Sequence, residues 1–234
     1  MDLVRELPAS ERPREKAEHC GVACLSNQEL LAVLIRTGSS GTSALAIARQ
    51  LLQAAGGIGG LNRMDMTELC RIRGVKKVKA LELQACFELA RRMSYEETRN
   101  KDVISDPDSL FRWLQREIGG RLQEHFLAVY LDTQNCIITY RTLFIGTLNA
   151  ALVSPREVFR EALLLSSAAI LLVHNHPSGD LTPSTEDLRL TRRMMEIGRL
   201  MEIRVLDHLI VSASGCASLY RAGLMAEDAV AEEA

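Results

Sequence analysis

The first hundred residues alternate between apolar segments at helical spacing and short polar breaks. Ser26, with Glu29 three residues later, forms a capping-box pattern ahead of the apolar segment 30–35. A second amphipathic segment, opened by Thr42 or Ser43, ends at a cluster of glycines. The pattern predicts a helical region, with helices at about residues 30–35, 43–55, 65–70 and 80–93.

Beyond residue 110, strand-like runs are mixed with helical ones. Alternating or continuous apolar runs predict strands at residues 124–132, 136–142, 168–173, 204–211 and a short one that ends at Tyr220. Helices are predicted at residues 110–118, 154–165 and 184–201. The last of them is expected to bury Leu188, Met194, Met195, Ile197 and Met201. Because strands and helices mix without strict alternation, the second half favours an α+β fold.

The stretch between these two regions is polar and has almost no apolar periodicity. From Tyr95 to Ser109 it is rich in acidic residues and holds Pro107. Such a composition is typical of a connection between domains. The chain is therefore expected to comprise a helical domain at residues 1–95, a linker at 96–108 and a second domain at 109–226.

Composition excludes some classes of protein. The net charge of −2 over 234 residues gives no whole-chain case for nucleic-acid binding, although residues 1–100 hold 15 Lys and Arg against 12 Asp and Glu. The longest apolar run, 162–173, is too short to span a bilayer, and the first residues carry no secretory apolar segment. Six cysteines lack a disulfide-framework spacing. We expect a cytoplasmic protein without membrane contact, with its cysteines reduced and packed as small core residues.

One stretch carries candidate chemistry. His174 and His176 end the apolar run 168–173, and as strand residues two positions apart they point to the same side. Ser184 then opens a helix with Asp187 in its first turn. Two imidazoles and a carboxylate are three ligands for a hard-to-borderline divalent metal. Zinc in a hydrolytic site has three protein ligands and leaves its fourth position to water. Taken singly, each residue has a simpler interpretation, because Ser184 and Asp187 also fit a helix cap and a buried histidine is usually a core residue.

The spacing His-x-His-x7-Ser-x2-Asp resembles the motif of the JAMM (MPN+, JAB) metalloproteases, and the wording His-Asn-His-Pro-Ser-Gly-Asp resembles the bacterial RadC family. The resemblance implies an MPN/JAB-type domain with a mixed sheet flanked by helices. It also implies zinc held by His174, His176 and Asp187, with Ser184 supporting the oxyanion. Glu157, in the tetrapeptide Ser-Pro-Arg-Glu, is implied as the residue that handles the proton of the water. The residues alone do not separate Glu157 from Glu161, and Glu157 also fits a capping box at the start of its helix.

The turn around Gly74 resembles a degenerate helix-hairpin-helix motif, in which a glycine turn and a helix N-terminus meet a DNA phosphate. Lys76 stands where the motif has its second glycine. Basic side chains could contact phosphates instead, namely Arg71, Arg73, Lys76, Lys77 and Lys79. The alternative is a packing module with a solvated basic turn.

Together these features predict a zinc-dependent hydrolase that uses activated water, and the family resemblance implies that it cleaves a peptide or isopeptide bond. The alternative is a DNA-associated accessory protein of the RadC type that binds DNA through its helical domain. A third possibility is a protein-interaction module, because JAMM-like domains that lack the metal ligands serve as scaffolds. The full set of ligands is present here, which speaks against this possibility. His208 could support a metal ligand from behind, but we expect a core histidine.

Overall fold

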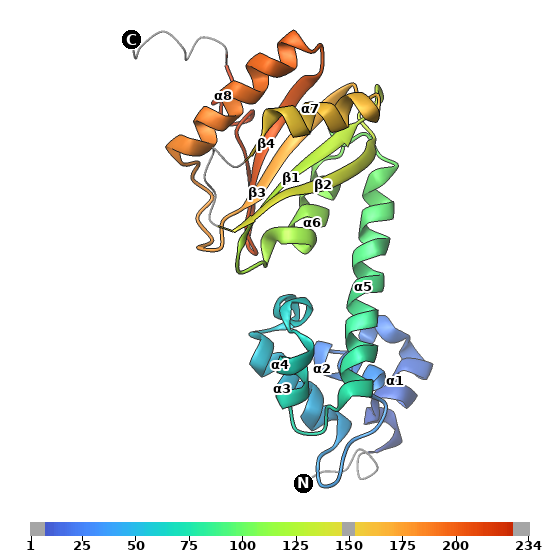
Figure 1. Ribbon diagram of the computed structural model, residues 1–234. Coiled ribbons are helices and arrows are strands. Elements are labelled where there is room, and N and C mark those ends of the chain that lie inside the picture. Colours follow the sequence, from blue (N-terminus) through green and yellow to red (C-terminus); the bar gives the residue numbers. More distant parts are fainter. Residues whose placement is uncertain (1–7, 147–152, 227–234) are drawn as a thin grey trace. The chain divides into compact units, whose positions relative to one another are not determined.

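The computed structural model describes residues 8–146 and 153–226, and the chain separates into two compact units at residues 1–90 and 91–234. Figure 1 shows a helical first unit and a second unit built on a sheet. The predicted α+β fold, a helical region followed by a mixed sheet with flanking helices, is confirmed. Within the described ranges, every helix is too short or too polar to cross a membrane.

Short helices pack around an aliphatic core in the first unit. Its elements are η2 (Ala9–Glu11), α1 (Pro13–Cys20), η3 (Val22–Cys24), α2 (Asn27–Ile35), α3 (Ala44–Ala55), η4 (Ile58–Arg63), α4 (Met66–Arg71) and the start of α5 (Lys77–Arg99). The caps predicted at Ser26 and Ser43 are confirmed, because each side chain accepts a hydrogen bond from the backbone at the third helical position. The buried core includes Leu31, Ile35, Ile47, Leu51, Leu69 and Leu83.

The turn between α4 and α5 is fixed by backbone geometry and by one lysine. Gly74 has a φ of +94°, and a Cβ there would lie 2.6 Å from Ile47 Cδ1, so glycine is required. Lys79 Nζ donates to the carbonyl oxygens of Thr37 at 2.6 Å, Gly74 at 3.2 Å and Gly38 at 3.3 Å. Its three donors are thus used inside the unit.

The cysteines depart from expectation. Cys20 and Cys24, at the end of α1 and in η3, are exposed and form a disulfide. Cys70 is exposed, and Cys86, Cys136 and Cys216 are only partly buried. The prediction that the cysteines are reduced core residues was therefore wrong for the pair and for Cys70, because residues four apart at a helix end meet at the surface.

The start of the predicted linker is helical. α5 continues through Arg99, and Ser94 and Thr98 are buried along it. Tyr95 contributes the aromatic contact that apolar periodicity did not reveal, since its ring centroid lies 5.3 Å from that of Trp113. Residues 91–99 accordingly belong to the second unit, and an irregular segment follows only from residue 100 to 106.

A five-stranded sheet forms the centre of the second unit, in the order β2-β1-β3-β4-β5. Its strands are β1 (Glu124–Leu131), β2 (Ile137–Gly146), β3 (Ala169–Asn175), β4 (Arg204–Val211) and β5 (Cys216–Ser218). β3 and β4 are parallel, joined through α8 (Thr185–Leu200), and the other neighbours are antiparallel.

Helices cover both faces of this sheet (Figure 1). On one face, α6 (Pro107–Leu114) and the short π-helix η5 (Gln115–Gly119) pack against the odd-numbered residues of β1 and β3, with Trp113 and Leu114 in the contact. On the other face, α7 (Pro155–Leu164) and α8 pack against the even-numbered ones, such as Phe126 and Leu172. Since His174 and His176 are also even-numbered, β3 directs them to the α7–α8 face.

The buried face of α8 differs from the predicted one. Of the five residues expected inside, Met194 alone is buried, whereas Asp187, Leu190, Thr191 and Gly198 join it. These residues recur at intervals of three or four and so form one stripe. The helix is therefore turned to bring the polar side chains of Asp187 and Thr191 inward, which apolar periodicity could not indicate.

Candidate metal centre

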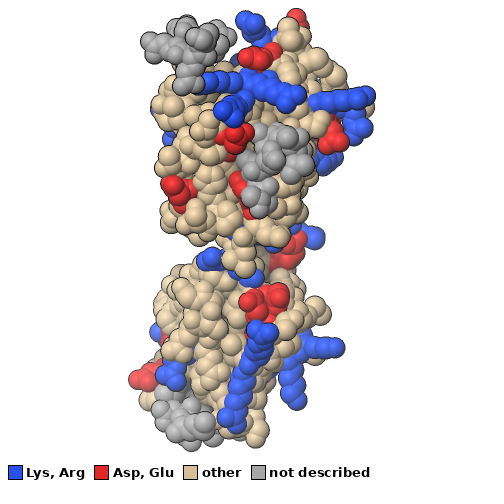
Figure 2. Space-filling view, turned by 60° about the vertical axis from the view of Figure 1, so that its left-hand side comes forward, with Lys and Arg blue, Asp and Glu red and all other residues tan. Residues whose placement is uncertain are grey.

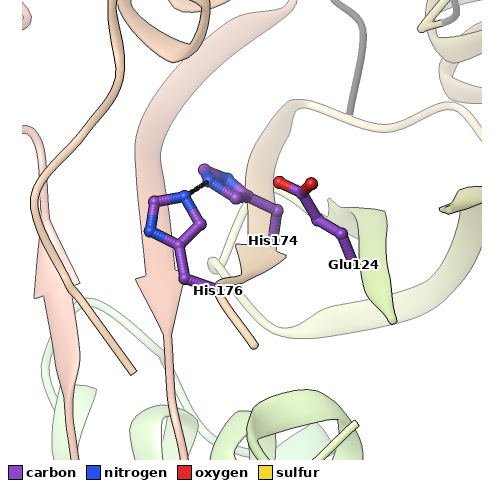
Figure 3. A group of neighbouring side chains, drawn as sticks. All are labelled: Glu124, His174 and His176. Carbon is purple, nitrogen blue, oxygen red and sulfur yellow. Dashed lines mark hydrogen bonds between the residues drawn. The ribbon is translucent and has the colours of Figure 1, made fainter. Parts of the chain in front are cut away.

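One end of the sheet brings the start of β1 beside the end of β3. The strands are antiparallel, and Phe126 pairs with His174. Because side chains two residues apart share a strand face, Glu124 lies on the same face as these two residues. Figure 3 shows the Glu124 carboxylate directed toward the imidazole of His174. Glu124, His174 and His176 each offer one ligand atom, and these atoms all lie within 4.8 Å of one another.

The imidazoles also meet the carboxylate of Asp187 at the start of α8. The Nε2 atoms of His174 and His176 are 2.9 Å apart. Asp187 Oδ1 lies 3.2 Å from His174 Nε2, and Oδ2 lies 3.7 Å from His176 Nε2. A tetrahedral zinc ion with bonds of about 2.0–2.1 Å holds its ligand atoms roughly 3.3 Å apart. The two separations that share one set of ligand atoms, 2.9 Å between the Nε2 atoms and 3.2 Å from His174 Nε2 to Asp187 Oδ1, lie close to this value, so the donors fit a zinc-sized ion.

Asp187 divides its two oxygens between the helix and the centre. Oδ2 accepts from Ser184 N at 2.7 Å and from Ser184 Oγ at 2.6 Å, which completes a capping box. Oδ1 is buried without a hydrogen bond in the described part of the chain. Such an oxygen is costly unless a ligand occupies it, so it fits a cation. Burial alone would raise the pKa of Asp187, but the imidazoles of His174 and His176 hold it well below its usual range.

Both histidines engage the ring nitrogen that faces away from the centre. His176 Nδ1 lies 2.7 Å from the backbone oxygen of Asp180. Because a carbonyl oxygen only accepts, Nδ1 carries the proton and Nε2 keeps its lone pair. His174 Nδ1 lies 2.9 Å from Nε2 of His208. Contact with Asp187 raises the pKa of His176, whereas complete burial lowers the pKa of His208.

Asn175 holds the backbone on both sides of Glu124. Lying between the two histidines, it points to the opposite face of β3 and is fully buried. Its Oδ1 accepts from His125 N at 2.7 Å, and its Nδ2 donates to Gln123 O at 3.1 Å and Arg121 O at 3.2 Å. The start of β1, and with it the direction of Glu124, is thereby fixed to the strand that carries the histidines.

Glu157 is not part of this group. It occupies the third position of α7 and is exposed. Ser154 precedes the helix and Pro155 begins it, as predicted, but the Ser154 side chain makes no capping hydrogen bond. The capping box, which was the alternative interpretation of Glu157, is therefore not formed. Glu161 forms an ion pair with Arg141 at 2.9 Å.

The basic residues of the α4–α5 turn have two different environments. Arg71, Arg73, Lys76 and Lys77 are exposed, whereas Lys79 is partly buried and bound to backbone carbonyls. On the face of the first unit drawn in the lower half of Figure 2, Lys and Arg side chains lie among acidic ones. Four of the five basic residues thus remain free of bonds to backbone carbonyls within the described residues, whereas Lys79 is engaged by them.

Sequence reasoning missed Glu124, Asn175 and Thr191, and treated His208 as a core residue. Glu124 offered one usable signal, since it begins a strand in phase with its buried face, where a charge has no packing reason. Thr191 lies four residues after Asp187, on the same side of the helix. For Asn175 and His208, no local pattern points to a role.

Comparison with known proteins agrees with this architecture. Residues 104–224 match the family of RadC-like JAB domains, and residues 4–81 match the UPF0758 N-terminal family. A UPF0758 protein of Shouchella clausii is 43% identical over 96% of this chain and 97% of its own length. One from Bacillus pumilus is 41% identical over 95% and 100%, and one from Roseiflexus castenholzii 42% over 94% and 95%. The predicted resemblance is confirmed, and the chain belongs to the RadC family of UPF0758 proteins.

Proposed function

We propose that this protein is a zinc-dependent hydrolase of the JAMM type that cleaves a peptide or isopeptide bond. The convergence of His174 Nε2, His176 Nε2 and a buried Asp187 oxygen beside the Glu124 carboxylate is the observation that carries the proposal. A structural zinc site has four protein ligands. Here the fourth group is a carboxylate within 4.8 Å of the histidine nitrogens, which suits proton transfer as well as binding.

Zinc held by His174, His176 and Asp187 would supply a Lewis acid and lower the pKa of water to about 7. The protein's own residues then have separate tasks. Glu124 takes the proton of the attacking water and returns it to the leaving amine, because its carboxylate faces the histidines from the neighbouring strand. This role passes from Glu157, which is exposed on α7, to Glu124.

Ser184 has a more limited task than the family resemblance implies. Its hydroxyl has one proton, which it donates to Asp187 Oδ2 at 2.6 Å. In this arrangement Ser184 orients Asp187, so that Oδ1 faces the histidines. Donation to an oxyanion requires the hydroxyl to rotate away from Asp187. Asp187 Oδ2 would then still accept the hydrogen bond from Ser184 N, so it would not be left without a donor.

The test compares two glutamate variants in a cleavage screen with zinc-loaded protein. Glu124→Gln should retain zinc and fold but lower hydrolysis by about 10²- to 10⁴-fold, because an amide cannot take the proton. Glu157→Gln is the matched control and should stay within about twofold of the wild type, since surface substitutions away from the site have small effects. Wild type that binds no zinc contradicts the metal centre, and loss of activity in Glu157→Gln alone returns the role to that residue.

DNA association remains a second candidate. Four exposed cations lie from the last residue of α4 to the first residue of α5 and favour this function, namely Arg71, Arg73, Lys76 and Lys77. No base-reading side chain is implied by this arrangement, so the contact would be to phosphates and independent of sequence. Binding of the full-length protein to duplex DNA at low salt is the measurement that decides.

A further inference from the structure

A buried chain of hydrogen bonds leads away from the metal centre and returns to it. His174 Nδ1 lies 2.9 Å from His208 Nε2. His208 Nδ1 lies 2.5 Å from Thr191 Oγ1, and Thr191 Oγ1 donates to the backbone oxygen of Asp187 at 2.6 Å. The chain therefore starts at one proposed ligand, His174, and ends on the backbone of another, Asp187.

The direction of the protons follows from the two ends. Asp187 O can only accept, so the single hydroxyl proton of Thr191 points to it. Thr191 Oγ1 must then accept from His208, which places the proton of His208 on Nδ1 and leaves Nε2 as an acceptor. His174 in turn donates from Nδ1, and its Nε2 presents a lone pair to the centre.

Packing shields these groups from solvent. His174 and His208 are fully buried, and Thr191 and Asp187 are at most 1% exposed. β3 and β4 are parallel neighbours in which Leu172 pairs with His208, so the two histidines come from adjacent strands. The ring of Phe126 stacks on His174 at 6.0 Å and meets His208 edge-on at 5.6 Å between centroids. With water excluded, the proton pattern of the chain is set by the protein alone.

We propose that His208 and Thr191 are positioning residues. They hold the proton of His174 on Nδ1 and fix the imidazole of His174 beside the carboxylate of Asp187. The proposal rests on the zinc centre proposed above. A metal-binding imidazole whose outer N–H is bonded is oriented in advance and is a stronger donor. His208 then has a role beyond that of the core histidine that its sequence context predicts. The bond to His208 also gives a reason why Thr191 faces inward from α8.

His176 provides an internal reference. Its Nδ1 bonds to the backbone oxygen of Asp180. No substitution in the hydrogen-bonded series His174–His208–Thr191, called the relay below, removes that oxygen. In the metal-free protein, loss of the bonds from His174 through His208 to Thr191 should thus disturb the NMR signals of Nδ1 in His174 and His208 and leave that of Nδ1 in His176 unchanged. General unfolding would disturb all three.

The test uses three threonine variants. Thr191→Val removes the hydroxyl at nearly constant shape, and Thr191→Ser restores it. Thr98→Val is the matched control, because Thr98 is also buried in a helix and donates to the carbonyl oxygen four residues earlier, that of Ser94 at 2.9 Å, but touches no imidazole. Stability loss common to both valine variants measures the helix contact, and any excess in metal binding belongs to the relay.

Two readouts decide. Zinc affinity by chelator competition should fall roughly 10- to 100-fold in Thr191→Val, recover in Thr191→Ser and stay at the wild-type value in Thr98→Val. Long-range proton–nitrogen NMR should show His208 protonated on Nδ1 in the wild type, with or without zinc. Wild-type affinity in Thr191→Val, or His208 protonated on Nε2, overturns the relay while leaving the zinc centre standing. A wild type that binds no zinc overturns the centre itself, and the relay with it.

Discussion

The two units of this chain place their polar side chains in opposite ways. Over the described residues, Thr42 is the only buried polar residue of the first unit, whereas the second unit buries eleven, among them His174, Asp187 and His208. A buried polar group is costly without a partner, so such a cluster persists only when its members satisfy one another or a ligand. Exposed lysines and arginines need no such arrangement. We therefore expect substitutions of single buried polar residues to have large effects in the second unit. In the first unit, the exposed cations can replace one another, so single substitutions should have small effects.

Substitution of a proposed zinc ligand in the second unit should produce the largest effect. If it does not, the contrast drawn between the two units is wrong. We expect about one zinc per chain in the wild type and loss of most of it in His174→Ala or Asp187→Ala, since three protein ligands hold the ion. Elemental analysis after dialysis is the measurement. Asp106→Ala serves as the control, because Asp106 also caps a helix through its carboxylate but lies outside the centre. Full zinc content in both ligand variants would contradict the assignment.

The pH dependence of stability should change sign with the metal. The pKa of His176 is raised in the folded metal-free protein, chiefly by Asp187. A raised folded-state pKa contributes stability that is present below the unfolded value of about 6.5 and is lost as pH rises through the folded value. Zinc competes with this proton, so stabilisation by zinc should instead grow as pH rises. Melting temperatures at several pH values, with zinc and with a chelator, measure both slopes.

Asp187→Asn provides the control for that experiment. It removes the negative charge that raises the pKa of His176. The slope of the metal-free protein above pH 6.5 should then flatten, and the stabilisation by zinc should shrink with it. Parallel slopes with and without zinc in the wild type would show that His176 does not exchange a proton for the metal.

DNA binding should show the smallest effect and sharpens the contrast between the units. Each phosphate contact adds about 0.9 to the slope of log K against log salt on duplex DNA. Lys76→Glu with Lys77→Glu should lower that slope by about two and weaken all sequences alike, without loss of zinc. Fluorescence titration of the full-length protein measures it.

Lys79→Gln separates structure from binding in the same turn. Lys79 donates to three backbone carbonyls, so its loss should lower stability rather than the salt slope. Destabilisation of about 1 kcal/mol is expected from the loss of these partly exposed hydrogen bonds. A slope lowered by Lys79→Gln at unchanged stability would instead place that ammonium on DNA.

Most elements could be predicted because their signals are local. Ser26 and Ser43 begin their helices as expected, and the strand at 204–211 has the predicted bounds. α5 ran longer than predicted because Tyr95 packs on Trp113, a contact between segments that apolar periodicity does not register. The disulfide between Cys20 and Cys24 was likewise missed, since the spacing of two cysteines does not state whether their sulfur atoms meet.

The sequence by itself determined the grouping of His174, His176 and Asp187. Alternation along a strand puts the histidines on one side, and a short turn with a capping serine brings the first helical turn back to them. These relations need only neighbouring residues, which is why a spacing motif captures them.

The tertiary structure alone decided that Glu124, His208 and Thr191 lie around His174 and Asp187. Glu124 reaches His174 through the antiparallel register of β1 with β3, and His208 reaches it through the parallel register of β4. Register between strands depends on the packing of both sheet faces, and a shift of one residue would turn every side chain to the opposite face. Register between strands cannot be deduced from one segment, so the family pattern pointed to Glu157 whereas the structure brings Glu124 to the histidines.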